Sequence, residues 1–188
     1  MYPVIKALAR LVDVAFNISD VYREYVRRSN PLILESATGF GLNLALVLDI
    51  ALRLDGRVYS IDISGYSTAL AKYIYKGFTS RGILKIKRGD LRKLHYADST
   101  FDYSVNHTTM HHIDPGEIPT AVRELWRTLK KGGLLAVADI NPLPAGIGAH
   151  SLGNLRKAKE ATISSIESLF KVVEFRERRL SYHIVAEK

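Results

Sequence analysis

The chain has 188 residues, and its 27 Lys and Arg against 19 Asp and Glu give a formal net charge of +8. It contains no cysteine, which excludes disulfides, metal centres with Cys ligands and any mechanism that uses a thiolate nucleophile. No uncharged apolar run approaches the roughly 20 residues that cross a bilayer, so a transmembrane protein is excluded as well.

The first predicted element is an amphipathic helix over residues 4–16, in which apolar positions recur at helical spacing. Charged residues interrupt this apolar stretch and no small-residue cleavage site follows, so we expect no secretory signal and a cytoplasmic location. Ser19 and Asp20 are typical caps of a second short helix, which must end before Pro31. Residues 1–30 are thus predicted to form a helical cap.

Strands and helices alternate over the next part of the chain, residues 31–140. This pattern predicts a parallel sheet that helices cover on both faces. The expected strands are residues 32–34, 57–63, 84–88, 101–105 and 134–140. The expected helices are residues 42–52, 68–77 and 118–129.

The last part, residues 141–188, is predicted to supply a substrate-side loop, a helix and the closing strands. The loop covers residues 141–154, which are rich in Gly and Pro and lack periodicity, and its length suggests a function. A helix is expected over residues 158–170 and two strands over 171–187. The whole chain, 1–188, is therefore predicted to be a single domain around the core of residues 31–140.

Acidic and glycine residues follow the ends of the predicted strands. Glu35 to Gly41 reads Glu-Ser-Ala-Thr-Gly-Phe-Gly between the first strand and its helix, where a glycine turn lets a ligand approach the backbone. Asp62 ends the second strand, 27 residues after Glu35, where a carboxylate can accept both hydroxyl hydrogens of a ribose. The two elements together predict a nucleoside-containing ligand at the carboxyl edge of the sheet.

Two more observations narrow the range of candidate ligands. Asp90 follows the third strand, where its carboxylate can accept from the exocyclic amine of an adenine. The dinucleotide fingerprint would place a third glycine at position 44, which is Leu44, so a nicotinamide-dependent dehydrogenase is disfavoured. Taken singly, each motif also has a structural explanation as a turn, a helix cap or a surface carboxylate.

In the order of these motifs the chain resembles the class I S-adenosylmethionine-dependent methyltransferases, especially the small-molecule group of ubiquinone and menaquinone biosynthesis. The resemblance covers about residues 31–140. It implies an α/β fold, a Rossmann-like three-layer sandwich whose seven-stranded, mostly parallel sheet has an antiparallel C-terminal strand. It also implies methyl transfer from S-adenosylmethionine to an O, N or C atom of a small molecule, with S-adenosylhomocysteine as product.

The resemblance further implies which residues bind the cofactor. The methionine part would lie against Glu35, Gly39 and Gly41, with Ala37 where the first glycine is usual, and against Asn106, which would face the amino group. Alanine tolerates most backbone conformations outside the left-handed region, so this departure bears on the tightness of the turn. Asp62 would hold the ribose, Ile63 would pack on the adenine, and Asp90 with the backbone of Leu91 would read the adenine edge.

A histidine cluster follows the fourth strand. His107, His111, His112 and Asp114 have the side chains of zinc or iron ligands, but related family members often carry a His-His pair here without metal, so we expect none. His107 is the candidate to face the acceptor and, as a histidine near neutrality, to remove its proton. His150 in the long loop is a second candidate.

The sequence says least about the methyl acceptor. The absence of cysteine excludes methylation at C5 of pyrimidines, which uses a cysteine nucleophile. The resemblance also implies that enzymes that methylate exocyclic amines of nucleic acids carry an Asn/Asp-Pro-Pro-aromatic motif after the fourth strand. This chain has Asn106-His107-Thr108-Thr109 there, which disfavours that class. The segment Arg81 to Lys93 holds six basic residues and one acidic residue, which keeps RNA as a possible partner beside a small molecule.

The sequence also allows a protein that binds S-adenosylmethionine without being an enzyme, and it does not specify the oligomeric state. Because glutamine is absent and Met occurs only twice, the composition favours a thermophilic source.

Overall fold

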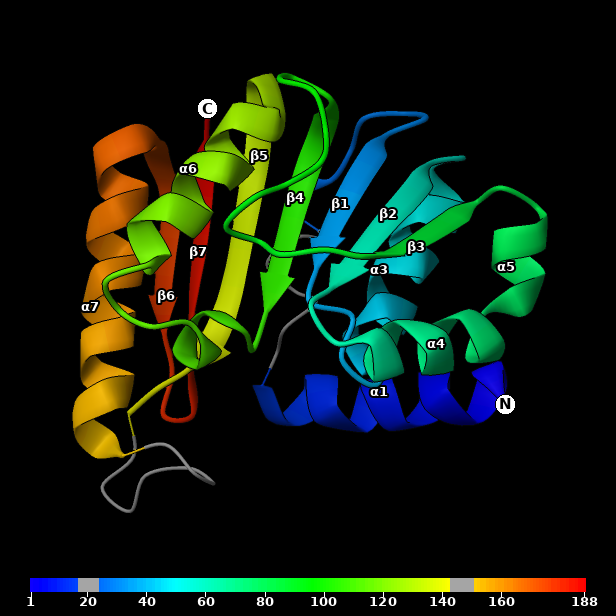
Figure 1. Cartoon of the computed structure of the whole chain (residues 1–188), viewed down its shortest axis with the longest axis horizontal. Coiled ribbons are helices and arrows are strands. Elements are labelled where there is room, and N and C mark those ends of the chain that lie inside the picture. The colour runs from blue at the N-terminus through cyan, green and yellow to red at the C-terminus, as the bar shows by residue number, and fades with distance from the viewer. Residues whose placement is uncertain (17–23, 143–150) are drawn as a thin grey trace.

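The computed structural model describes residues 1–16, 24–142 and 151–188, and its centre is one seven-stranded sheet (Figure 1). The strand order is β3-β2-β1-β4-β5-β7-β6. Every neighbouring pair from β3 to β5 is parallel, and β7 runs antiparallel to both β5 and β6. The predicted α/β fold with an antiparallel C-terminal strand is therefore confirmed. The strands are β1 (Leu32–Ser36), β2 (Arg57–Asp62), β3 (Leu84–Arg88), β4 (Phe101–His107), β5 (Leu129–Ile140), β6 (Lys171–Glu177) and β7 (Ser181–Glu187).

Helices pack on both faces of this sheet and complete three layers. One apolar core joins the sheet to α1, α3, α4 and α5, and the other joins it to α6 and α7. The described helices are α1 (Tyr2–Phe16), α3 (Leu42–Arg53), α4 (Gly65–Ile74), α5 (Lys76–Ser80), the 3-10 turn η1 (Met110–His112), α6 (Ile118–Thr128) and α7 (Leu152–Leu169).

The alternation of side chains along β5 explains why both faces are covered. Leu135 and Val137 belong to the core under α6 and α7, whereas Ala136 and Ala138 belong to the opposite core. Successive side chains of a strand point to opposite faces, so an apolar run has to be buried on both sides. The same alternation decides on which face of the sheet the polar side chains at the strand ends lie.

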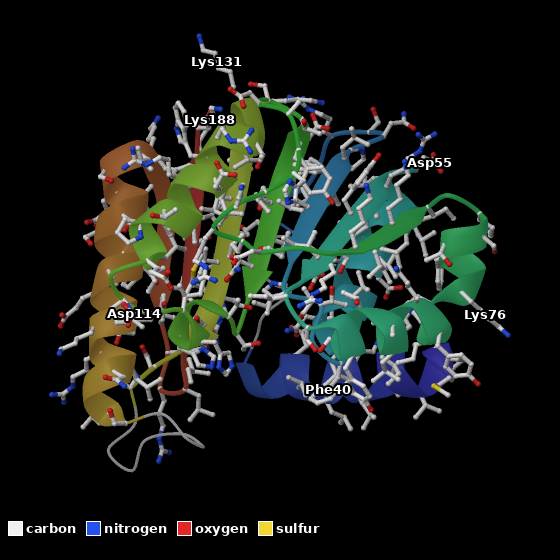
Figure 2. All side chains as sticks on the ribbon, viewed as in Figure 1. Phe40, Asp55, Lys76, Asp114, Lys131 and Lys188 are labelled. Carbon is white, nitrogen blue, oxygen red and sulfur yellow. The ribbon has the colours of Figure 1, made fainter. Side chains whose placement is uncertain are left out.

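The carboxyl ends of β1 to β5 meet at one edge of the sheet, because these strands are parallel. In Figure 2 this edge is the lower one, where Phe40 and Asp114 lie. Asp55, Lys131 and Lys188 mark the opposite edge. The described loops that follow the parallel strands therefore converge on the side of Phe40 and Asp114.

Two helices begin earlier than the sequence pattern predicts, because each has a serine cap before its apolar residues. The predicted helix over residues 68–77 begins at Gly65, since the hydroxyl of Ser64 accepts from the N–H of Ser67, and it breaks at Tyr75 between α4 and α5. Most of the predicted loop over residues 141–154 lies outside the described residues. Helix α7 begins at Leu152, before the predicted start at residue 158, because Ser151 caps it by accepting from the N–H of Asn154.

The start of β5 also differs. It begins at Leu129 and not at residue 134, and the pairing with β4 shifts register around Gly132, whose φ is 69°. The predicted Lys-Lys-Gly-Gly turn is thus an irregularity inside the strand.

Helix α1 packs against α3 and lies along the lower edge in Figure 1, on the side of the carboxyl ends of the parallel strands. Ala9 of α1 is buried in the core with α3, and the ammonium of Lys6 lies 2.5 Å from the carboxylate of Asp49. Arg28 pairs with Asp102 at the amino end of β4. The predicted capping residues Ser19 and Asp20 lie outside the described residues.

None of the described helices combines the length and the apolar run that a bilayer crossing requires.

Asp102 gives a first test of the fold. Its buried carboxylate accepts from the N–H of Leu32 at 2.9 Å and pairs with Arg28 and Lys130, so it ties β1, β4 and β5 together. We expect Asp102→Ala to lower the free energy of unfolding by about 2 kcal/mol, measured by urea denaturation, because a backbone donor and two cations lose their partner.

The pH dependence of the same contribution has a definite sign. Burial alone would raise the pKa of Asp102, but the N–H of Leu32 and the cations of Lys130 and Arg28 hold it below the ordinary value of 3.8. The contribution is therefore present above about pH 4 and is lost as the pH falls through the lower pKa. Asp98→Ala is the matched control, because Asp98 is 76% exposed and its pair with Arg127 contributes less than about 1 kcal/mol. Equal losses in both variants would contradict the role of Asp102.

Candidate functional site

A cavity of about 510 Å³ lies at the carboxyl edge of the sheet, over the ends of β1, β2, β3 and β4. Cavities that hold small molecules or cofactors measure roughly 300–1,000 Å³. The lining comes from the loops that follow these strands, from η1 and from the start of α6. It consists of Ala37, Thr38, Gly39, Phe40, Leu42, Asn43, Ile61, Asp62, Ile63, Gly89, Asp90, Leu91, Arg92, His107, Thr108, Thr109, His112, Ile113, Asp114 and Glu117.

The loop between β1 and α3 is unusually tight. Ala37, Gly39 and Gly41 all have positive φ, at 93°, 48° and 82°. Ala37 therefore adopts the left-handed region that alanine disfavours, at a strain of about 1 kcal/mol or more, and the N–H of Ala37 donates to the carbonyl of Ile61 at 2.8 Å. The loop is therefore tight even though alanine stands at the position of the family's first glycine, which differs from what an alanine there suggests.

The two glycines of this loop have different surroundings. A side chain at Gly39 would meet no protein atom within 4 Å, so this backbone faces open space in the cavity. A Cβ at Gly41 would lie 2.8 Å from the ring of Tyr75, whose hydroxyl donates to the Gly41 carbonyl. Gly41 is thus required for packing at the start of α3 and does not line the cavity.

Asp62 connects the loops after β1 and β2. One carboxylate oxygen accepts from the N–H of Gly39 at 2.7 Å, and the other accepts from the N–H of Ser64 at 2.8 Å. Each oxygen of a carboxylate has capacity for a second donor. Asp62 therefore presents a fixed pair of acceptors to the cavity, beside Ile63, which is 58% exposed.

Glu35 lies beneath the cavity and not in its wall. It is 1% exposed and accepts from the hydroxyl of Ser60, whose oxygen lies 2.5 Å from the hydroxyl of Thr38. Burial raises the pKa of Glu35 to about 8, with Ser60 opposing this shift and the nearby charge of Asp62 adding to it. Thr38 lines the cavity, so Glu35 reaches the site through two hydroxyl groups.

Asp90 is paired inside the protein. The guanidinium of Arg92 donates to both of its oxygens, at 2.6–3.1 Å, and the hydrogen bonds from Arg92 hold the pKa of Asp90 below its usual value. Arg92 also donates to Glu117, just before α6. The sequence interpretation found Asp90 and Leu91 in this wall but missed Arg92 and Glu117, although an arginine two residues after the aspartate was a visible signal.

The end of β4 carries two predicted site residues. Asn106 is fully buried, its amide donates to the Ser36 hydroxyl at 3.0 Å, and it does not line the cavity. His107 does line it but is only 3% exposed. Burial, with a contribution from His183, lowers the pKa of His107 to about 3, so the expectation of a histidine near neutrality is wrong and its ring is a weak base.

Comparison with known families decides the class. A family model described as a methyltransferase domain matches residues 34–137, more than half of the chain. The chain belongs to this methyltransferase family. It is an S-adenosylmethionine-dependent methyltransferase, which confirms the predicted class and cofactor, whereas the expected likeness to the quinone-biosynthesis group stays a prediction. No curated protein sequence matched the chain.

Solved structures agree on the fold of this methyltransferase. An S-adenosylmethionine-dependent methyltransferase from Aquifex aeolicus is 19% identical, with a TM-score of 0.75 over 99% of this chain and 97% of that chain. The [4+2]-cyclase SpnF is 17% identical, with a TM-score of 0.72 over 93% and 80%. Geranyl diphosphate C-methyltransferase from Streptomyces coelicolor A3(2), in complex with Mg²⁺, geranyl diphosphate and S-adenosyl-L-homocysteine, is 10% identical, with a TM-score of 0.71 over 90% and 78%.

The histidine pair, His111 and His112, belongs to η1, next to the cavity. His111 donates its N–H to buried Asp139, and its Nδ1 lies 2.5 Å from the other oxygen of that carboxylate. The ring of His112 lies 4.0 Å from that of His111 and lines the cavity. Among the described residues no three His, Asp or Glu side chains are grouped to hold a metal ion. His150 lies outside the described residues.

Three of the six basic residues in the segment Arg81 to Lys93 lie on the edge strand β3. Lys85 stacks over the ring of Tyr59, the guanidinium of Arg88 donates to the carbonyl of Ile63, and Arg92 is neutralised by Asp90 and Glu117. Lysines on an edge strand also prevent pairing with another sheet. These contacts account for much of the segment without a nucleic-acid partner.

The buried carboxyl of Glu35 gives a testable pH dependence. Its pKa of about 8 in the folded protein lies above the value of 4.5 for a free side chain, so the folded state binds the extra proton between these values. The stabilising contribution is present below about pH 4.5 and is lost as the pH rises through 8. We therefore expect the free energy of unfolding to fall as the pH rises over this range. The raised pKa corresponds to a decrease on the order of a few kcal/mol.

Glu35→Gln removes this titration and keeps the acceptor oxygen. Urea denaturation at several pH values should therefore give a flatter pH profile for Glu35→Gln than for the wild type. Glu167→Gln, at an exposed position of α7, is the control and should keep the wild-type slope. Parallel profiles for all three proteins would refute the assignment.

Proposed function

We propose that this methyltransferase transfers the methyl group to a small molecule and that the cavity at the carboxyl edge holds the cofactor. The observation that carries this proposal is the carboxylate of Asp62, which faces the cavity with both oxygens fixed by the backbone of Gly39 and Ser64. A fixed pair of acceptors matches the two adjacent hydroxyl groups of a ribose. The open space above Gly39 leaves room for a ligand next to the backbone.

The remaining cofactor contacts follow from the same placement. Exposed Ile63 would pack on the adenine, with Asp90 and the backbone of Leu91 at the adenine edge. Because Arg92 occupies both oxygens of Asp90, that carboxylate would share its acceptor capacity between the guanidinium and the base. The family's adenine contact would therefore include Arg92 in this chain.

The methionine part would lie over the loop of Ala37, Gly39 and Gly41. Glu35 would act there through the hydroxyls of Ser60 and Thr38, since its own side chain does not reach the cavity. Asn106 would act from behind the wall, by fixing Ser36.

When bound, S-adenosylmethionine supplies an electrophilic methyl group on a sulfonium. The protein's part is to align the acceptor and exclude water, and alignment alone supplies much of the barrier reduction. Thr108, Thr109 and His112 line the acceptor side and carry groups that can orient a polar acceptor. His107 would shape this wall as a neutral ring.

A small acceptor fits the surroundings better than RNA does. The cavity is lined by loops of one domain, whose extent we propose to be residues 1–188. Part of the basic segment already has internal contacts, which leaves fewer cations for RNA. One of the similar folds, the geranyl diphosphate C-methyltransferase, is named for a small substrate.

Binding of S-adenosylhomocysteine tests the cofactor site. We expect Asp62→Ala to weaken binding at least about tenfold in isothermal titration calorimetry, because hydrogen bonds to a charged group are lost. Gly39→Val should weaken it as strongly, since a branched side chain is strained at a φ of 48° and would project into the cavity. Asp98→Ala, a surface carboxylate at the other edge, is the charge-matched control and should bind like the wild type. Equal affinity in all four proteins would rule out this site.

The acceptor class needs a separate measurement. Incubation with methyl-labelled cofactor and fractionated cell extract should place the label in the small-metabolite fraction and not in RNA. Asp62→Ala, run beside the wild type, should reduce this labelling. Label retained in RNA would overturn the small-molecule proposal and leave the cofactor site intact.

A further inference from the structure

A second cavity, of about 540 Å³, lies between α7 and the turn that joins β6 to β7. In Figure 1 this turn and the first residues of α7 lie at the lower edge, the same edge as the ends of the parallel strands. Cationic side chains from both elements outnumber the anionic ones in the lining. The charged residues in it are Arg156, Lys159, Glu160, Glu177, Arg178 and Arg179.

Asn141, 6% exposed and directly after β5, holds this cavity together. Its amide donates to the carbonyls of Arg178 and Ser181, and its N–H donates to the carbonyl of Leu180 at 2.9 Å. Its side-chain oxygen accepts from the ammonium of Lys159 at 2.9 Å. One buried side chain thus fixes the turn against α7, so the backbone that carries the arginines is preorganised.

The charges in the cavity do not cancel. Lys159 pairs with Glu177 at 2.8 Å. Arg156, Arg178 and Arg179 have exposed guanidinium groups, and within the described part of the chain none of the three forms an ion pair. Glu160 is the one remaining carboxylate among the described charged residues of the lining. Three guanidinium groups therefore surround one space with an excess of positive charge.

We propose that this cavity binds a phosphate group, and that it does so for the terminal phosphate or diphosphate of the methyl acceptor. A guanidinium donates two parallel hydrogen bonds to a phosphate, and several converging arginines match a dianion better than they match a single carboxylate. The second part of the proposal rests on the proposed function.

The position relative to the cofactor cavity supports one ligand spanning both. β4 and β5 are neighbours, and His107 of the first cavity is paired with Ala138, three residues before Asn141 of the second. Strand spacing and rise put the backbones of His107 and Asn141 about 11 Å apart. A small molecule of ordinary length can cover that distance with a phosphate at its far end.

Calorimetric titration with inorganic pyrophosphate tests the site without the acceptor. We expect the wild type to bind it and Arg178→Ala/Arg179→Ala to bind it at least about tenfold more weakly, since charge-assisted hydrogen bonds are lost. The matched control, Arg81→Ala/Lys87→Ala, removes the same charge from the basic segment and should stay within about twofold of the wild type. Arg156→Ala, from the opposite wall, should also weaken binding.

Four outcomes decide the proposal. No binding to the wild type, or equal loss in both double variants, overturns the site. Stronger, steeply salt-dependent binding of a ten-nucleotide RNA that needs Arg178 and Arg179 overturns the small-molecule source of the phosphate. S-adenosylhomocysteine binding is measured on the same proteins and should be unchanged in Arg178→Ala/Arg179→Ala, which also verifies its fold. If the wild type binds pyrophosphate and not S-adenosylhomocysteine, the cofactor proposal fails while the phosphate site stands.

Discussion

The hydrogen bond from the N–H of Gly39 to the carboxylate of Asp62 is the contact on which the cavity depends. It joins the loop after β1 to the end of β2, the neighbouring parallel strand. The loop it holds contains three residues with positive φ, one of them an alanine, and such a backbone persists only where the surroundings determine it. One oxygen of the carboxylate thus holds this loop, the other holds the turn before α4, and the side chain lines the cavity.

Directly beneath this contact lies a carboxyl that the fold keeps protonated. Glu35 is held by the hydroxyl of Ser60 in a place where a full charge would be costly, and its raised pKa expresses that cost. A protonated Glu35 is a hydrogen-bonding group without the field of an anion, so Asp62 is the negative charge next to the loop. The sequence, which presents Glu35 and Asp62 as two acidic residues of equal standing, gives no sign of this division.

The sheet and the residues at its strand ends were predictable because local pattern and topology agree. Buried runs separated by helices imply parallel strands, and parallel strands bring Asp62, Ile63 and Asp90 to one edge whatever the packing details. Placement that depends on distant segments was not predictable. His107 loses basicity because the folded chain buries it, with a smaller contribution from His183 of β7, and Arg28 lies at the amino edge of the sheet, where it pairs with Asp102.

Charged surfaces show the same contrast between what the sequence pattern predicts and what the tertiary structure decides. The Arg81 to Lys93 segment is conspicuous in the sequence because its cations are contiguous, yet in the fold they spread along an edge strand and several have internal contacts. Arg156 is separated from Arg178 and Arg179 by more than twenty residues of chain, and the three meet only because Asn141 fastens the last turn against α7. The charge density that a ligand experiences is a property of tertiary structure, so a run of cations in sequence is a weaker indicator of an anion site than cations brought to one cavity.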